Sequence, residues 1–543
     1  MPRPSRRLAL GLLLFVTAAL ISAAFLHLPP LVAFSNDPRL WLFELTGEEH
    51  LAGQLRGVAQ WAFAITRPLP QTRPDVAVAH TDLPPFGVNT FLEQEVEPEK
   101  RERSVEMIAN AGFHWIRQSF PWYDIEIHGK GDFEDRRHDP YRSAWDKYDA
   151  IVDLAEAYDL EIIARLEQPP AWSRYDGTAR GDFGPPDNLE DFADYAEAVV
   201  TRYRGRIRHY QVWNEPNIYP EWGNQPVDPE AYTDLLCLTY RRIKAVDPEA
   251  VVISGALAPT IELGTWNPNY EGNNLMDVVF LQRMYDAGAG GCFDVLAVND
   301  YMLRSGPTDH RLSPYEVNFS RPMWVRDVMV ANGDAHKPIW ISEMNSNVVP
   351  EGMPDPYGRV TVEQQARYAP LAFERIQREW PWVGVTSVWF FKRASDAERD
   401  QPWYYFRLVE PDFTPMPVYH ALADYINNLE PTLYRGSHQA TSWQLSYDER
   451  WETVDAPNAV INAHRCSDKP GATIAWHWEG RSLTLIPGDA KSIVRLRDGA
   501  GRERDVTITS TPKRLGGALF PSRRHTTLTL VDGKICIAEL QVR

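Results

Sequence analysis

The sequence has few cysteines, and no pattern of them indicates a metal site. Four occur in 543 residues: Cys237, Cys292, Cys466 and Cys536. They are too few and too scattered for a disulfide framework, and no two form a CxxC pair of the kind that binds zinc. Cys466 and Cys536 share the C-terminal segment, so they either pair in an oxidising compartment or are buried free thiols. We expect neither a metal nor an organic cofactor.

Positive charge is also in deficit, because 56 Lys and Arg face 74 Asp and Glu, a formal net charge of −18. Nucleic acid and anionic membrane surfaces repel such a chain before short-range contacts form, so we expect no nucleic-acid partner. A composition of 44% hydrophobic and 24% charged residues excludes a disordered or fibrous protein. The 19 Trp and 23 Tyr exceed what a core needs and suit the flat faces of neutral sugar rings.

The N-terminus has the order of an export signal. Three arginines, at positions 3, 6 and 7, precede an uncharged run from Leu8 to Leu26. Ser22-Ala23-Ala24 offers a cleavage site, but about 19 apolar residues exceed the usual signal-peptide core and suffice to span a bilayer. We predict that residues 1–35 are a signal peptide or a signal anchor, with the anchor favoured. The remaining chain is then extracytoplasmic, either membrane-anchored by this helix or secreted.

Residues 36–82 form a preamble to the main domain. Trp41 to Ile65 is loosely amphipathic and is expected to lie on the membrane or on the following domain. Arg67 to Pro85 contains several prolines and is typical of a linker.

From Phe86 onward, short apolar runs alternate with longer segments of helical period. The expected strands are Phe86–Asn89, His114–Phe120, Glu161–Glu167, His209–Asn214, Val251–Ala256, Phe293–Asn299, Pro338–Glu343 and Val383–Phe391. The expected helices are Glu99–Asn110, Ser143–Tyr158, Leu189–Tyr203, Pro229–Ala245, Met276–Ala287, Thr361–Trp380 and Pro417–Asn428. Eight alternations predict an α/β fold, a (β/α)8 TIM barrel over residues 83–430, and the absence of GxGxxG after the first strand disfavours a doubly wound sheet.

After about residue 430 the helical period stops. Period-two alternation in Ile474–Trp478 and Thr526–Leu530, with turn signals at Asp498-Gly499 and Asp532-Gly533, predicts a β-sandwich over residues 431–543. The same spacing puts Trp476 and Trp478 on one sheet face, which favours core packing over a sugar platform. A carbohydrate-binding role for this domain is open.

Functional groups of a parallel barrel lie where its strands end. The side chains expected there are Arg117, Trp122, Glu167, Trp172, Asn214, Glu215, Tyr301, Glu343, Asn345 and Trp389. Glu215 and Glu343 follow the fourth and seventh strands, so they face one another across the mouth. Cleavage of an acetal needs one protonated carboxyl, to protonate the leaving oxygen, and one ionised carboxylate near the anomeric carbon. This layout is typical of a glycosidase. Glu167 either binds substrate or only forms a salt bridge with Arg117.

Three segments resemble clan A retaining glycoside hydrolases, most closely family 39. Trp213-Asn214-Glu215-Pro216-Asn217 is similar to the acid/base motif that closes the fourth strand. Ile341-Ser342-Glu343-Met344-Asn345-Ser346 is similar to the nucleophile segment of family 39, which includes β-xylosidases, α-iduronidases and exopolysaccharide-cleaving enzymes. Gly112–Arg117, followed by Phe120-Pro121-Trp122, resembles that family's second strand. The resemblance covers about residues 86–428.

The resemblance implies a role for each matching residue. Glu215 would be the acid/base and Glu343 the nucleophile of a double displacement, Asn214 would donate to the sugar 2-hydroxyl, Arg117 and Tyr301 would orient Glu343, and Trp389 would lie beneath the sugar. Two positions depart from the pattern: Asn299 stands where the clan usually has His, and Met344 replaces an aromatic residue. The substrate would be a polysaccharide or oligosaccharide, of exopolysaccharide or xylan type.

Two other functions compete with this interpretation. One is a non-catalytic carbohydrate-binding protein on a glycosidase-like barrel, which the presence of both carboxylates disfavours. The other is a metal-dependent hydrolase, which needs His or Asp clusters at the strand ends. None of the 14 histidines falls at those ends.

Overall fold

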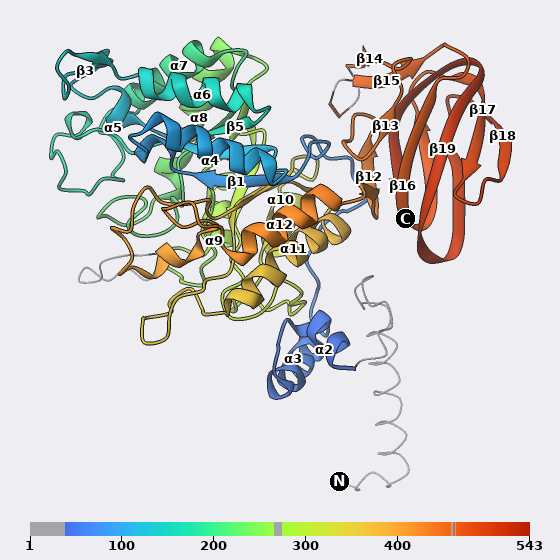
Figure 1. Ribbon diagram of the computed structural model, residues 1–543, viewed down its shortest axis with the longest axis horizontal. Helices are drawn as coiled ribbons and strands as arrows, with labels where there is room; N and C mark the ends of the chain where they lie inside the picture. The colour runs from blue at the N-terminus through green and yellow to red at the C-terminus, as the bar shows by residue number, and fades with distance from the viewer. Residues whose placement is uncertain (1–37, 265–273, 458–459, 462) are drawn as a thin grey trace, which may run out of the picture.

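The computed structural model describes residues 38–264, 274–457, 460–461 and 463–543. Its larger unit is the predicted parallel barrel, with strands surrounded by helices (Figure 1). The strands are β1 (Phe86–Thr90), β2 (Trp115–Pro121), β5 (Glu161–Glu167), β6 (His209–Val212), β7 (Val251–Ile253), β8 (Leu296–Asn299), β9 (Ile339–Met344) and β10 (Val383–Val388). They pair in the order β7-β6-β5-β2-β1-β10-β9-β8. Parallel bridges Ile253–Val295 and Leu257–Val298 link the two ends of this order.

The barrel helices match the expected ones and add one more. They are α4 (Pro98–Asn110), α6 (Asp146–Ala157), α7 (Leu189–Tyr203), α8 (Pro229–Val246), α9 (Asp277–Asp286), α10 (Pro322–Ala331), α11 (Val362–Glu379) and α12 (Pro417–Asn428). The sequence analysis did not identify α10, a ten-residue helix between β8 and β9. Short elements between β2 and α6 are α5 (Trp122–Ile125), β3 (Glu134–Asp135) and β4 (Arg142–Ser143).

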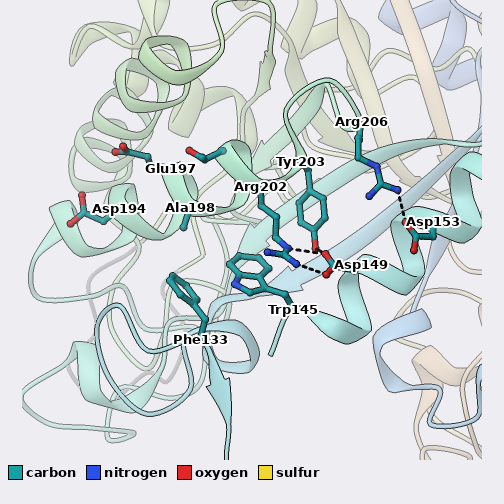
Figure 2. Close-up of a pocket in the computed structure, with 11 residues that line it drawn as sticks. Phe133, Trp145, Asp149, Asp153, Asp194, Glu197, Ala198, Arg202, Tyr203 and Arg206 are labelled. Atoms are coloured by element: carbon teal, nitrogen blue, oxygen red, sulfur yellow. Dashed lines mark hydrogen bonds and ion pairs between the residues drawn. The ribbon is translucent and has the colours of Figure 1, made fainter. Parts of the chain in front are cut away.

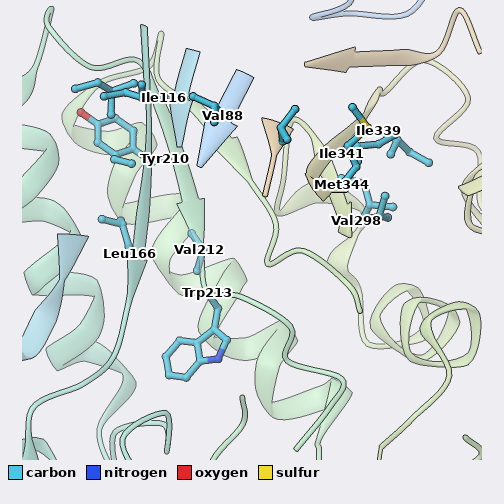
Figure 3. Packing of buried hydrophobic residues seen from close by; sticks show 14 of the residues in the cluster. Val88, Ile116, Leu166, Tyr210, Val212, Trp213, Val298, Ile339, Ile341 and Met344 are labelled. Atoms are coloured by element: carbon cyan, nitrogen blue, oxygen red, sulfur yellow. The ribbon is translucent and has the colours of Figure 1, made fainter. Parts of the chain in front are cut away.

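Alternation along the strands divides the core into two layers. Outward-facing side chains such as Ile116, Val212 and Ile341 pack under the helices in one large cluster (Figure 3). Inward-facing Trp115 and Trp340 belong to a separate cluster that fills the barrel. Polar side chains one step further along the strands, including Arg117 and Gln211, are buried above it. The barrel is therefore plugged with apolar groups below and polar groups above.

The preamble packs on the barrel. It contains α2 (Pro38–Thr46) and α3 (Leu51–Ala64). Phe43 is buried in the barrel's large apolar cluster, with its ring 6.0 Å from that of Tyr368 on α11. The predicted signal or anchor, residues 1–35, lies outside the described residues. Within the described part, we find no helix with the length and apolar character needed to cross a bilayer.

The C-terminal unit is a second sheet domain (Figure 1, orange to red). Its strands are β11 (Thr432–Leu433), β12 (Gly436–Gln439), β13 (Ser446–Tyr447), β14 (Glu452–Asp455), β15 (Ala463–Ser467), β16 (Thr473–Pro487), β17 (Lys491–Asp498), β18 (Glu503–Ile508) and β19 (Lys513–Val542). They form one nine-stranded sheet in place of two separately paired sheets. Strand β16 pairs with two separate segments of β19, because Leu485 of β16 lies opposite both Lys513 and Leu540. Trp476 and Trp478 are buried in its core, as expected.

All four cysteines form disulfides. Cys466 pairs with Cys536, which resolves the alternative left open by the sequence. Cys237 pairs with Cys292, a bond that the expectation of scattered cysteines missed. Cys237 lies on α8 and Cys292 follows α9. Because helices of neighbouring βα units pack side by side, these two residues are adjacent in the structure although they are 55 residues apart in the sequence.

We expect the barrel disulfide to stabilise the fold by restricting the unfolded chain. The double variant Cys237→Ala/Cys292→Ala should lower the free energy of unfolding of the barrel by about 2–4 kcal/mol. Urea denaturation, followed by a spectroscopic signal of the barrel, measures this change. Cys466→Ala/Cys536→Ala is the matched control, because it removes the other disulfide and leaves the barrel's own bond. A barrel transition affected equally by both variants would contradict the assignment.

Candidate active site

Glu215 stands just beyond β6 on a backbone that L-residues rarely adopt. Trp213 and Glu215 have φ of 75° and 43°. Asn214 between them bridges to Ala256, and the Glu215 N–H donates to the Ala256 carbonyl. Positive φ at two bulky residues costs conformational energy and is held by the surrounding contacts. Such strain is concentrated at functional sites, where it fixes the direction of a side chain.

Glu343 reaches the barrel interior through a bulge in β9. Val298 of β8 pairs with Ile341, but the next residue, Asn299, pairs with Glu343. Ser342 is thus an extra residue in β9. Strict alternation would turn either Ser342 or Glu343 away from the interior. With the bulge, Ser342 accepts a bond from Gln211 and Glu343 contacts Arg117, while Met344 packs in the outer cluster.

Both carboxylate oxygens of Glu343 are held. Arg117 Nη1 donates to Oε1 at 2.9 Å and Tyr301 OH donates to Oε2 at 2.6 Å. Arg165 Nη1 lies 3.9 Å from Oε1. Glu343 is only 4% exposed, so these charge-assisted bonds fix its carboxyl group inside the barrel. Burial first, and then the charge of Glu343, hold the pKa of Tyr301 well above its ordinary value, so the phenol keeps its proton and donates.

Arg117 is fixed by acceptors from four places in the barrel. In addition to Glu343, it donates to Gln211 Oε1 at 2.6 Å, Asn89 Oδ1 at 2.7 Å and Asn214 Oδ1 at 2.8 Å. The last bond ties the motif around Glu215 to the residue that holds Glu343. Because Asn214 accepts through its oxygen, its amide N–H groups are the ones left to donate to a ligand.

Glu215 has a different environment from Glu343. Asn299 Nδ2 donates to Glu215 Oε1 at 2.8 Å, and no described Arg or Lys forms an ion pair with Glu215. Burial and, next, the negative charge of Glu343 raise the pKa of Glu215, and the bond from Asn299 opposes this only in part. Glu215 therefore favours the protonated form, whereas Glu343 is paired with an arginine. Asn299, noted in the sequence as a departure, is the residue that contacts Glu215.

Glu167 pairs with a different arginine from the one expected. Its partner is Arg165, with Nη2 at 2.7 Å from Oε1, and Ser119 Oγ donates to the same oxygen at 2.9 Å. The predicted salt bridge between Glu167 and Arg117 is therefore wrong. Arg117 lies on β2, whereas Arg165 lies on β5 together with Glu167 and forms the ion pair.

Trp389 and Tyr301 belong to an aromatic group at the mouth of the barrel. Both are partly exposed and pack with Phe91, Phe390 and Phe406. Asn345 is buried beneath them, and its Nδ2 donates to the carbonyls of Trp389 and Phe406, each at 2.7 Å. Asn345 therefore holds the Trp389 segment in place, and its amide nitrogen is not free for a substrate.

The two other predicted tryptophans stand together beside β2. Trp122 is fully buried, donates to Glu126 Oε2 at 2.6 Å and stacks on Tyr195. This burial corrects the predicted substrate contact of Trp122, which is a core residue. Trp172 packs edge-on against it and is partly exposed, so of the two it is the one that a ligand can reach.

Sequence reasoning missed several polar residues of the site. Three of them, Arg165, Gln211 and Asn89, point into the barrel from strands that pair with β2 or with its neighbour β5. Their positions could have been predicted by aligning these strands with β2 so that their inward-facing residues match Arg117. Glu221, eight residues after Trp213, also belongs here, since burial and then the charge of Glu215 hold its pKa well above the ordinary value. It lies in an irregular loop that has no sequence period.

A hollow on the outer helices is separate from this site. It has a volume of about 930 Å³ and lies over α6 and α7 (Figure 2). Arg202 pairs there with Asp149, Arg206 with Asp153, and Arg202 covers the ring of Trp145 at 5.1 Å. Its arginines are thus satisfied by internal partners. Among the described residues, no group of three or more His, Cys, Asp or Glu side chains is placed to hold a metal ion.

Comparisons with known proteins give distant similarities. No protein-family profile matches the chain. A curated relative, β-glucosidase 40 of Arabidopsis thaliana, is 23% identical in an alignment of 228 residues that covers 37% of this chain and 42% of that protein. The chain thus spans less than half the length of this relative.

Solved structures with a similar fold include two family 39 glycoside hydrolases. The enzyme of Bacteroides cellulosilyticus WH2 is 19% identical, with 84% of this chain and 83% of that chain covered and a TM-score of 0.49. A β-xylosidase of Caulobacter crescentus is 16% identical, with 86% and 97% covered and a TM-score of 0.43. A glucosidase of Croceicoccus marinus is 12% identical, with 86% and 96% covered and a TM-score of 0.47.

The pKa of Glu215 should depend on the charge at position 343. Glu343→Gln removes a negative neighbour, so we expect the pKa of Glu215 to fall, while burial keeps it above that of an exposed carboxyl. Glu343→Asp is the matched control, since it keeps the charge and should leave the pKa raised. Carbon-13 NMR titration of labelled glutamate, assigned with Glu215→Gln, measures both. An unchanged titration in Glu343→Gln would show that the two groups are not coupled.

Proposed function

We propose that the protein is a retaining glycoside hydrolase that acts by a two-carboxylate double displacement. One observation carries this proposal: the carboxyl ends of β6 and β9 present two glutamates in opposite environments. Glu343 accepts hydrogen bonds from Arg117 and Tyr301, and Glu215 is driven toward the neutral form by burial and by the charge of Glu343. An acetal is cleaved by such a pair, one member as acid and the other as nucleophile.

In the first step, Glu215 gives its proton to the glycosidic oxygen as the bond from that oxygen to the anomeric carbon breaks. A Glu343 oxygen attacks the same carbon and forms a glycosyl ester. Loss of the charge on Glu343 then lowers the pKa of Glu215, which has given up its proton and now acts as a base. It takes a proton from water, whose oxygen attacks the anomeric carbon and releases Glu343 as a carboxylate.

The lining of the mouth favours a carbohydrate chain as substrate. Trp389, partly exposed beside Tyr301, offers an aromatic face to a sugar ring, and Asn214 has amide N–H groups to donate to a hydroxyl. The substrate is a polysaccharide or oligosaccharide, either an exopolysaccharide of the cell envelope or a xylan-type polymer.

An extracytoplasmic location is part of the proposal. Two disulfides require an oxidising environment to form and persist, which supports export directed by residues 1–35. If that segment is uncleaved, it anchors the enzyme to the membrane.

A non-catalytic carbohydrate-binding protein is the alternative. It would bind glycans without releasing product, so a panel of aryl glycosides and envelope polysaccharides, followed by reducing-end and product-size analysis, separates the two functions. The product size also tells internal from terminal cleavage. Binding without product would overturn the enzymatic proposal.

The roles of the two glutamates predict different rescue by azide. Glu343→Gly should lose activity by several orders of magnitude and recover in azide, giving a glycosyl azide of inverted configuration, because azide enters on the vacated face. Glu215→Gly should lose about 10²–10⁴-fold on poor leaving groups, and azide should give a product of retained configuration. Nuclear magnetic resonance of the products distinguishes the isomers. Interchanged stereochemistry would reverse the two assignments.

The alkaline limb of the pH–rate profile should report Glu215. Activity needs this group protonated, so kcat/KM should fall as pH rises through its raised pKa. Asn299→Ala removes a bond that stabilises the ionised form of Glu215, so the pKa should rise and the limb should move to higher pH. An unmoved limb, or a shift to lower pH, would contradict the part assigned to Asn299.

A further inference from the structure

The charge of the molecule is unevenly divided. Residues 431–543 hold 16 Lys and Arg against 12 Asp and Glu, although the whole chain carries a net charge of −18. The sheet domain is thus cationic on a strongly anionic protein. A net charge that repels anionic surfaces from the barrel does not repel them from this domain, because charges further apart than about 10 Å are largely screened at ordinary ionic strength.

A four-residue bulge interrupts the pairing of β19 with β16 in this domain. Gly480 of β16 lies opposite Ser522 and Ser482 lies opposite Gly517, so only Arg481 faces the residues 518–521. Such a bulge pushes its residues out of the sheet. It carries Leu519 and Phe520, which are 81% and 72% exposed. Because the residues on both sides of the bulge are paired with β16, these two adjacent large apolar side chains stay exposed to solvent.

Cations surround the bulge. Lys513 and Arg514 precede it, Arg523 and Arg524 follow it, and Arg481 lies opposite. Arg523 pairs with Glu430, and the nearby Glu479 pairs with Arg378. Within the described residues, Arg481, Lys513, Arg514 and Arg524 have no ion pair with a carboxylate; Arg524 lies over the Trp478 ring at 4.7 Å and Arg514 donates to the Gly516 carbonyl.

A cavity of about 760 Å³ adjoins the bulge and extends the cationic surface. Its lining includes Arg497, Arg504 and Arg524, with Gly517 and Ser522 from the two flanks of the bulge. Guanidinium groups bind phosphate oxygens well, and the cavity has room for a phosphate-bearing headgroup.

We propose that the bulge, residues 518–521, docks the C-terminal domain on an anionic phospholipid surface. Leu519 and Phe520 enter the headgroup boundary while the surrounding arginines bind lipid phosphates. Apolar side chains ringed by Lys and Arg are the composition that favours an anionic membrane interface. An acidic polysaccharide would use the cations but would give no reason to expose Leu519 and Phe520. This docking is independent of glycoside hydrolysis.

A site-specific probe tests this proposal in the full chain, where the N-terminal segment could bind membranes by itself. Since the native cysteines are all in disulfides, Phe520→Cys gives one thiol for an environment-sensitive fluorophore. We expect its emission to rise and shift to the blue with vesicles of phosphatidylcholine and phosphatidylglycerol, and not with phosphatidylcholine alone. Tyr175→Cys, on an exposed barrel loop, is the matched control and should show no change.

Charge variants test the cationic ring. In the labelled Phe520→Cys chain, Arg514→Gln/Arg524→Gln should weaken the apparent partitioning onto anionic vesicles on the order of 30-fold. This factor corresponds to about 2 kcal/mol of binding free energy for the two arginines together. Arg450→Gln/Arg495→Gln removes two ion-paired arginines of the same domain and should have little effect. Unchanged thermal unfolding would show that all variants are folded.

Three results would overturn the proposal. The first is no response at position 520, or an equal response at position 175, with anionic vesicles. The second is the same blue shift with alginate in the absence of lipid, which would assign the surface to an acidic polysaccharide. The third is a shift that grows with protein concentration without vesicles, accompanied by a dimer in light scattering, which would assign it to a second copy of the chain.

Discussion

The buried ion pair between Arg117 and Glu343 is the interaction on which the site depends. A guanidinium and a carboxylate inside a barrel are stable only when they are paired and their remaining hydrogen bonds are satisfied. Arg117 meets this condition through Asn89, Gln211 and Asn214, and Glu343 through Tyr301. The pair therefore links β1, β2, β6 and β9, and it fixes the upper end of the barrel as well as the direction of one carboxylate.

The different state of Glu215 is a consequence of the same pair. A fixed negative charge at Glu343 disfavours a second one nearby, and Glu215 has an amide, Asn299, where Glu343 has an arginine. The site thus assigns acid and nucleophile through surroundings and not through residue type. Local strain at Trp213 and Glu215 and the extra residue Ser342 are the backbone costs of bringing the two carboxylates into one mouth.

The two domains differ in the kind of surface they present. Arginines in the mouth of the barrel and in the hollow over α6 and α7, such as Arg165 and Arg202, form internal pairs with carboxylates (Figure 2). The sheet domain leaves several cations without carboxylate partners, next to exposed apolar side chains. A barrel suited to neutral ligands is thereby joined to a domain suited to an anionic surface.

The sequence by itself determined the barrel and its strand-end residues. Period and strand length were enough for the eight strands and most helices, because each βα unit buries its own apolar stripe, and position at a strand end was enough for Glu215 and Glu343. Arg117 was also identified, but it is the third residue of β2 and does not lie at the strand end expected for it. Only the tertiary structure decided the partners. The link of Glu167 to Arg165, the Cys237–Cys292 disulfide and the burial of Trp122 depend on which residues of different units meet. The bulge at Ser342 and the protrusion of Leu519 and Phe520 depend on register between strands far apart in the chain, which no local pattern encodes.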